Sequence, residues 1–338
     1  MLLRGFIKMR LGFKVANVDA GCGIMLGGIT RGLTELGHQV VPWTLGVSCD
    51  HVLVFNVSSH INHYNWDDIE QLEGCKFAFI DTAEYGWWTH YDYHKDMYYS
   101  AFAPLAIKAK PPVQLKLLEF LKGKSYPYFL REMYKGFDYP ENYHPIDYPL
   151  YYHSRSDIQP TTFEEYKNRN WDVYIAWGHS HQTRVHITEM IKKLPFKIFA
   201  FCDSNAKLNQ FEYFKGLQNA KISVSYDGYG SGSFRETEVL SRCVLFRNVQ
   251  CVRRPNPLTN GVNFVEYTVE EKLGDDKYPI YVNTDVGELI TQHLSNLENL
   301  YNIYREGYKH CTEWLSEKGM AQYILETTQK HDWTVVTK

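Results

Sequence analysis

The sequence lacks several signatures that would point directly to one chemistry. It contains no CxxC pair, no HExxH motif, no GxxxxGK[ST] loop and no GxSxG turn. These absences leave a zinc site, a P-loop ATPase and an α/β-hydrolase without support. The 14 histidines form no cluster with metal-ligand spacing, so no motif requires a divalent metal ion.

Long apolar runs are also missing. No stretch approaches the ~20 consecutive apolar residues of a membrane span. The first residues, Met1 to Phe13, have neither the long apolar core nor the cleavage site of a signal peptide. The seven cysteines are scattered, which indicates reduced thiols. We therefore expect a cytoplasmic protein, or one of the host cytoplasm if the chain is viral, with no membrane span.

Neither sign of charge is in large excess. The 36 Lys and Arg against 39 Asp and Glu give a formal net charge of −3, which excludes a broad cationic surface for indiscriminate nucleic-acid binding. A local basic groove remains compatible with this balance. The 338 residues, 44% of them hydrophobic, suit two globular domains.

The N-terminal half predicts a doubly wound α/β domain. Its apolar runs lack alternation, as expected for strands covered on both faces. A glycine-rich loop and helix start at 20–28 and a helix at 29–38 separate the first two strands. The expected strands are 11–19, 39–43, 51–56 and 76–81. Residues 86–165, rich in Tyr, Pro and His, are expected to be an elaborated loop region and interdomain connection.

A second alternation of expected strands and helices begins at 171–178. The expected strands are 171–178, 196–202, 221–227, 243–248, 264–268 and 278–283, and the expected helices are 184–194, 211–220 and 234–242. Amphipathic helices fill 286–330. The sequence therefore predicts two Rossmann-like domains, 1–165 and 166–338, with C-terminal helices that close the second.

A glycine loop at 228–233 follows a strand and opens a helix. Glycines let a phosphate approach the backbone, and a helix N-terminus attracts anions. Arg235 can bind a diphosphate, and Glu238, three residues later, can accept ribose hydroxyls on the same helical face. A capping arrangement fits equally well, with Ser233 as N-cap and Arg235 and Glu238 as a surface pair. The loop residues assigned to the ligand are Gly230, Gly232 and Ser233.

A second loop of this kind lies at 178–184. Gly178, Ser180 and Thr183 can line a phosphate, and Arg184 can reach it. Taken alone, an ordinary strand-to-helix turn is the better interpretation. The presence of two such loops in one domain strengthens the phosphate-site interpretation of each, because ligands of open α/β sheets bind at the carboxyl ends of strands.

The N-terminal glycines Gly21, Gly23 and Gly27 weakly match a dinucleotide fingerprint. Such a site needs an acid at the end of the second strand. Val41, Pro42 and Trp43 occupy that place, so a nicotinamide-dinucleotide site is disfavoured.

A general base is needed if a hydroxyl group is to attack a ligand bound at these loops. Asp81 follows a buried strand and is the first choice, with Glu84 and Asp19 as further candidates. A turn-forming role for Asp81 is the commoner alternative.

Three segments, 13–41, 222–246 and 283–310, resemble the GT-B glycosyltransferases, including the LGH-x-V that ends the first helix. The resemblance implies two domains facing a central cleft and a nucleotide-diphosphate-sugar donor, with a UDP-sugar favoured. It implies no tightly bound cofactor. In that class the N-terminal glycine loop faces the cleft.

Several short motifs are similar to those of bacteriophage DNA β-glucosyltransferases. Arg235 and Glu238 look like their donor-site pair, and Gly178, Ser180 and Arg184 look like their second donor loop. Asp81 after KFAFI looks like their catalytic base. The Glu-x7-Glu of many retaining families is absent, since Gly230 precedes Glu238 by eight positions. This departure favours inversion.

The acceptor stays open between a glycan, a small molecule, a protein and a DNA base. A phage-type enzyme acting on hydroxymethylated DNA bases would use local cations, namely Lys108, Lys110, Lys116, Lys122, Lys124, Arg131 and Lys135. A non-catalytic nucleotide-sugar-binding module is the alternative from another class.

Overall fold

The computed structural model describes residues 8–15, 20–44, 46–55, 76–81, 126–131, 133, 135–136, 138–139, 141–150, 158–178, 182–203, 208–226, 234–273 and 279–331. The chain divides into two compact units. The first comprises Met1–Pro149, Val252–Pro255 and Ser316–Lys338, and the second comprises Leu150–Cys251 and Asn256–Leu315. The sequence had suggested one boundary between 165 and 166, whereas the chain passes between the units repeatedly.

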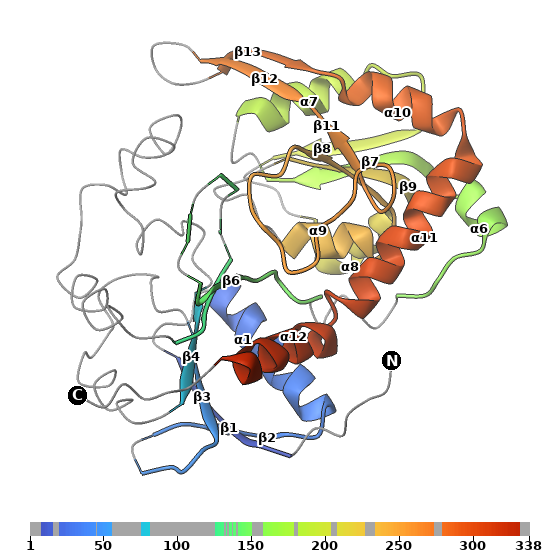
Figure 1. Ribbon diagram of the computed structural model, residues 1–338. Coiled ribbons are helices and arrows are strands. Elements are labelled where there is room, and N and C mark those ends of the chain that lie inside the picture. Colours follow the sequence, from blue (N-terminus) through green and yellow to red (C-terminus); the bar gives the residue numbers. More distant parts are fainter. Residues whose placement is uncertain are drawn as a thin grey trace. The chain divides into compact units, whose positions relative to one another are not determined.

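The first unit is built on a wholly parallel six-stranded sheet in the order β2-β1-β3-β4-β5-β6 (Figure 1). Its strands are β1 (Arg10–Val15), β2 (Gln39–Pro42), β3 (His51–Phe55), β4 (Phe77–Asp81), β5 (Tyr128–Leu130) and β6 (Tyr143–Pro145). The strands expected at 39–43, 51–56 and 76–81 are confirmed, and β1 confirms the described part of the strand expected at 11–19, whose residues 16–19 lie outside the described residues. Every residue of β4 is buried, as its continuous apolar run predicts.

Two features of the first unit correct the sequence analysis. β5 and β6 lie within 86–165, which was expected to be loop, and extend the sheet. Each has only three residues, too few to show a strand pattern. The segment 20–28, expected to hold a loop and the start of a helix, belongs entirely to helix α1 (Ala20–Glu35), so Gly21, Gly23 and Gly27 are helical.

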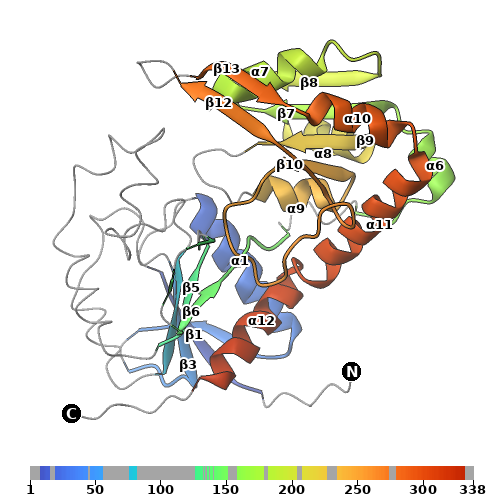
Figure 2. The ribbon, with the colours of Figure 1, turned by 45° about the horizontal axis from the view of Figure 1, so that its top comes forward.

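Glycines in α1 allow a close helix contact. A Cβ on Gly32 would lie 2.0 Å from the carbonyl oxygen of Glu317, and one on Gly28 would lie 2.5 Å from Cγ of Pro149. Helix α12 (Glu317–Lys330) therefore packs directly on α1, and both views show the two helices crossing (Figure 1, Figure 2). The contact explains why the last helix belongs to the first unit.

The second unit contains a parallel five-stranded sheet in the order β11-β10-β9-β7-β8. Its strands are β7 (Trp171–Trp177), β8 (Ile198–Cys202), β9 (Ala220–Ser225), β10 (Val244–Asn248) and β11 (Val265–Tyr267). Its helices are α6 (Phe163–Lys167), α7 (Gln182–Ile191), α8 (Gln210–Gln218), α9 (Phe234–Leu240), α10 (Val286–Leu294) and α11 (Leu297–Glu313). The expected alternation of strand and helix is confirmed.

A two-stranded antiparallel ribbon, β12 (Val269–Leu273) and β13 (Pro279–Thr284), lies beside α7 in Figure 2. The charged sequence VEEKL gave no strand signal at β12. The core of the unit joins the sheet to α11 through side chains such as Val224, Phe246, Ile303 and Tyr304. Among the residues that the structure describes, no helix is long and apolar enough to cross a membrane.

Candidate functional site

The two sequence-predicted loops leave neighbouring strands. β7 ends at Trp177 and β9 at Ser225, and the two strands pair in parallel at the centre of the sheet. Their carboxyl ends therefore meet at one edge, where ligands of such sheets bind. Gly178, directly after β7, is exposed, and a Cβ there would meet nothing within 4 Å.

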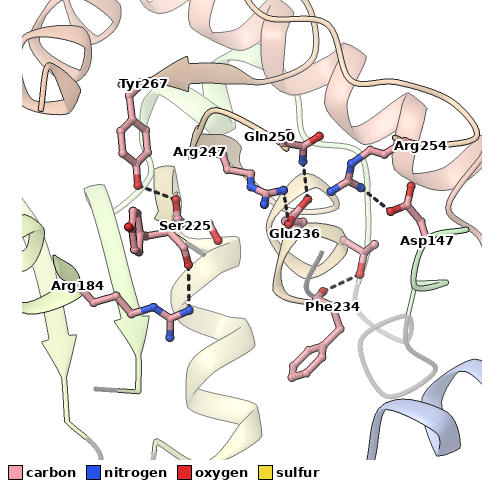
Figure 3. Close-up of polar contacts among 11 residues, drawn as sticks. Asp147, Arg184, Ser225, Phe234, Glu236, Arg247, Gln250, Arg254 and Tyr267 are labelled. Carbon is pink, nitrogen blue, oxygen red and sulfur yellow. Dashed lines mark hydrogen bonds and ion pairs between the residues drawn. The ribbon is translucent and has the colours of Figure 1, made fainter. Parts of the chain in front are cut away.

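Arg184 in α7 bridges the ends of both strands. Its Nη1 donates to the carbonyl of Gly178 at 3.2 Å, and its Nη2 donates to the carbonyl of Tyr226 at 2.9 Å. Figure 3 shows the Arg184 side chain extended toward the backbone next to Ser225. The carbonyl of Ser225 itself accepts a hydrogen bond from the Tyr267 hydroxyl at 2.7 Å. The guanidinium group is thus held at the strand ends.

Arg235 in α9 reaches the same two strands from the other loop. Its Nη1 donates to the carbonyl of Ala176 on β7, and its Nη2 donates to Oγ of Ser223 on β9 at 3.3 Å. Its Nε is buried and has no hydrogen-bond partner among the described residues. This N–H is a donor that a ligand could satisfy.

Trp177 lies beside both arginines. The Cζ atoms of Arg184 and Arg235 lie 5.6 and 5.9 Å from an indole ring centroid, within the range of cation–π attraction. The indole Nε1 donates to Oγ1 of Thr188 at 3.0 Å, which fixes the ring. Two guanidinium groups are therefore gathered at one place on the sheet edge.

Glu238 is almost completely buried, at 5% exposure, and accepts a hydrogen bond from the Tyr213 hydroxyl at 2.9 Å. Burial raises the pKa of its carboxyl to about 7, against the opposing influence of Tyr213, Arg235 and Arg242. The alternative interpretation as an exposed Arg–Glu pair is wrong, because the carboxylate lies inside the unit. A carboxylate with this pKa is partly ionised at neutral pH.

Glu236, the other acid of this segment, has a structural role. Its Oε1 lies 2.5 Å from Nη1 of Arg247, and its Oε2 accepts from Nε2 of Gln250 at 3.0 Å (Figure 3). Both partners of this ion pair are buried. The pair joins α9 to β10 and thereby helps to fix the helix that carries Arg235 and Glu238.

Two residues at this edge were not found by sequence reasoning. Tyr213 in α8 accepts from Nη1 of Arg235 at 3.0 Å while donating to Glu238. Glu271 in β12 accepts from the hydroxyls of Thr183 and, at 2.6 Å, Tyr226. Neither residue lies in a recognisable sequence motif, because its contacts at this site depend on how separate helices and strands pack together.

The base candidate Asp81 ends β4 in the first unit. It is fully buried, and its Oδ2 accepts a hydrogen bond from the Tyr128 hydroxyl at 2.7 Å. Arg131, expected to be a DNA-binding cation, is buried with its Cζ 4.9 Å from the ring centroid of Tyr148, whereas Lys135 is exposed.

The remaining candidates lie outside the described residues. They are Asp19, Glu84, Ser180, Gly230, Gly232, Ser233, Lys108, Lys110, Lys116, Lys122 and Lys124. Within the part of the chain that the structure describes, no group of three or more His, Cys, Asp or Glu side chains could hold a metal ion. That no metal is required stays a prediction.

No protein-family model and no curated protein sequence matches this chain. Solved structures resemble it in fold. An alpha-glucosyltransferase in complex with UDP and a 13-mer DNA containing a central A:G mismatch has a TM-score of 0.55 at 10% identity, with 96% of this chain and 100% of that chain covered. An alpha-glucosyltransferase in complex with UDP-glucose and DNA containing an abasic site has a TM-score of 0.52 at 9% identity and the same coverage. At these identities the likeness establishes the fold, and the predicted GT-B fold is confirmed.

Proposed function

We propose that this protein is a glycosyltransferase that moves a sugar from a nucleotide-diphosphate donor to a hydroxyl acceptor. The observation that carries the proposal is the convergence of Arg184 and Arg235 on the carboxyl ends of β7 and β9. Two guanidinium groups suit the charge and geometry of a diphosphate. A UDP-sugar is the favoured donor, in line with the UDP and UDP-glucose bound to the solved structures of similar fold.

In this proposal the loops 178–184 and 228–235 bind the diphosphate. Gly178, Ser180, Gly230, Gly232 and Ser233 bring backbone and hydroxyl donors to its oxygens. The arginines stabilise the charge that develops as the nucleotide diphosphate departs, which is usually a large catalytic contribution. Glu238 accepts hydrogen bonds from the ribose hydroxyls.

Asp81 is the proposed general base. The acceptor hydroxyl gives its proton to the carboxylate as its oxygen attacks the anomeric carbon. The bond from that carbon to the diphosphate oxygen breaks, and its electron pair leaves with the nucleotide diphosphate. Displacement in one step inverts the anomeric centre. Asp19 and Glu84 remain alternatives for the base.

The proposal is tested by donor binding and turnover. UDP-, GDP- and ADP-glucose are compared by thermal shift, since a ligand of the native state raises its apparent stability. Release of glucose from the best donor is then measured for the wild type, Arg235→Ala and Glu238→Ala. Lys192→Ala is the control, because Lys192 forms only an exposed pair with Glu189.

We expect both site variants to lose donor affinity and turnover, and the control to keep both. Unchanged affinity and turnover in both site variants would remove the donor-site assignment. Donor binding by the wild type without release or transfer would instead support the non-catalytic binding module.

A DNA base is the acceptor that we propose to test first. An alpha-glucosyltransferase in complex with UDP and a 13-mer DNA containing a HMU base has a TM-score of 0.51 at 10% identity, with 96% of this chain and 100% of that chain covered. A DNA acceptor predicts affinity that falls steeply with salt. Filter binding of HMU-containing and unmodified 13-mers between ~50 and ~200 mM salt measures this. No binding at any salt would leave a glycan, a small molecule or a protein.

A further inference from the structure

Tyr213 makes hydrogen bonds to the two charged residues of the proposed donor site. Its hydroxyl accepts from Nη1 of Arg235 at 3.0 Å and donates to Oε2 of Glu238 at 2.9 Å. We propose that Tyr213 is a positioning residue, whose hydroxyl holds the diphosphate-binding guanidinium and the ribose-binding carboxylate in one fixed arrangement. The roles of the two charged groups rest on the proposed function.

Helix α8, which carries Tyr213, is held in a fixed position by a helix cap and by close packing on the sheet. The side chain of Asn209 caps the helix by accepting from the backbone N–H of Glu212 at 2.8 Å. One turn after Tyr213, Gly216 lies against Tyr174 of β7, and a Cβ there would fall 2.2 Å from the tyrosine ring. Only a glycine permits this close approach, so the distance of α8 from the sheet is fixed.

A hydroxyl between the two charges has a different effect from a direct ion pair. Within the described residues no salt bridge joins Arg235 to Glu238. Each charged group therefore keeps hydrogen-bonding capacity for a ligand. Nε of Arg235 is buried without a partner among the described residues. The other Glu238 oxygen, Oε1, accepts no hydrogen bond from them.

The phenol is suited to this role because it stays neutral. Burial raises the pKa of Tyr213 well above 10.0. The hydroxyl therefore keeps its proton and can donate a hydrogen bond to Glu238 throughout the physiological pH range. A hydrogen bond to a carboxylate favours the ionised form, and here it opposes the burial that raises the pKa of Glu238.

Removing only the hydroxyl tests the proposal. In Tyr213→Phe, we expect the pKa of Glu238 to rise further, because the ionised carboxylate loses a donor. We also expect UDP affinity at pH 7 to fall by about tenfold, which matches the loss of a hydrogen bond between a neutral hydroxyl and a charged group. The pKa is followed by the ¹³Cδ resonance of labelled glutamate, and the affinity by calorimetry with UDP from pH ~5.5 to ~8.5.

Tyr166→Phe is the matched control. It removes another buried hydroxyl of the same unit, one that donates to the carbonyl of Lys221 at 2.9 Å. A general loss of stability would affect both variants, whereas only Tyr213→Phe should move the Glu238 titration. Glu238→Gln is the second variant: without a charged acceptor, the ¹³Cζ resonance of Tyr213 should shift in an otherwise intact protein.

Two results would overturn the proposal. One is a Glu238 pKa that is the same in Tyr213→Phe and the wild type. The other is a Tyr213 resonance that does not respond to Glu238→Gln. If the wild type binds none of UDP, GDP and ADP, the proposed function fails, while the two resonances still decide whether the Tyr213 hydroxyl bridges Arg235 and Glu238.

Discussion

Arg184 and Arg235, 51 positions apart in the chain, place their Cζ atoms 5.6 and 5.9 Å from an indole ring centroid of Trp177. Backbone carbonyls at the ends of β7 and β9 accept hydrogen bonds from both side chains. The carbonyls and the indole offset part of the repulsion between two like charges. A bound diphosphate would relieve the rest, which is why this pair supports the proposed donor site.

Glu238 should make the stability of the protein depend on pH. Its folded-state pKa of about 7 exceeds the ordinary value of 4.5 for a glutamate carboxyl. The folded protein therefore binds more protons than the unfolded chain between these values, and the free energy of unfolding falls as pH rises through that window. We expect the ionisation of Glu238 to lower the free energy of unfolding by up to about 3 kcal/mol between pH 4.5 and 7. Urea unfolding of the wild type and Glu238→Gln measures it.

The variant should lack this decline and bind UDP more weakly. A wild-type curve that runs parallel to that of Glu238→Gln across the window would show that the carboxyl is not buried as described.

The buried pair Glu236–Arg247 should be essential for stability. Glu236→Ala leaves the Arg247 guanidinium buried opposite a cavity, and breaking such a pair costs about 3–5 kcal/mol. Urea unfolding should show a matching decrease relative to the wild type. Glu189→Ala breaks the exposed pair with Lys192 and should change stability by less than about 1 kcal/mol. Equal effects of the two substitutions would contradict the buried placement.

The contact between α1 and α12 can be tested with two glycines of one helix. Gly32→Ala would place a Cβ 2.0 Å from the backbone oxygen of Glu317, so the helices must separate, and we expect a loss of about 2–4 kcal/mol. Gly27→Ala meets only the flexible end of Arg31, at 3.1 Å. Since alanine has a higher helix propensity than glycine, this control substitution should be neutral or should stabilise the protein by up to about 1 kcal/mol. Thermal unfolding separates the two outcomes.

His144 and His331 should weaken the first unit in acid. Their Nε2 atoms lie 2.7 Å apart, which requires one ring to donate and the other to accept. Burial, followed by the neighbouring His331, lowers the pKa of His144 from 6.5 to about 4. The unfolded chain binds more protons between these values, so the free energy of unfolding falls as pH decreases from 6.5 toward 4.

His144→Gln should reduce this acid sensitivity. The free energy of unfolding is measured for the wild type and the variant from pH 4 to 7. The difference between them gives the contribution of His144 alone, because the contribution of Glu238, which has the opposite sign, is the same in both proteins. A difference that does not vary with pH would rule out the buried histidine pair.

Much of the fold followed from local patterns. The apolar runs at β3, β4 and β7 predicted parallel strands, and the rule that ligands bind at strand carboxyl ends predicted that Arg184 and Arg235 would lie close together. β5, β6 and β12 could not be found in this way. The first two are too short for a pattern, and β12 is charged, so each is a strand only because a neighbouring strand pairs with it.

The sequence by itself determined the two α/β repeats and the cations that follow their strands, because hydrophobic periodicity and glycine placement are local properties. Only the tertiary structure decided that the α1 glycines serve helix packing, that Glu236 forms a buried ion pair with Arg247, and that Tyr213 joins Arg235 to Glu238. These outcomes depend on contacts between distant segments, whose distances and burial no local pattern of residues encodes.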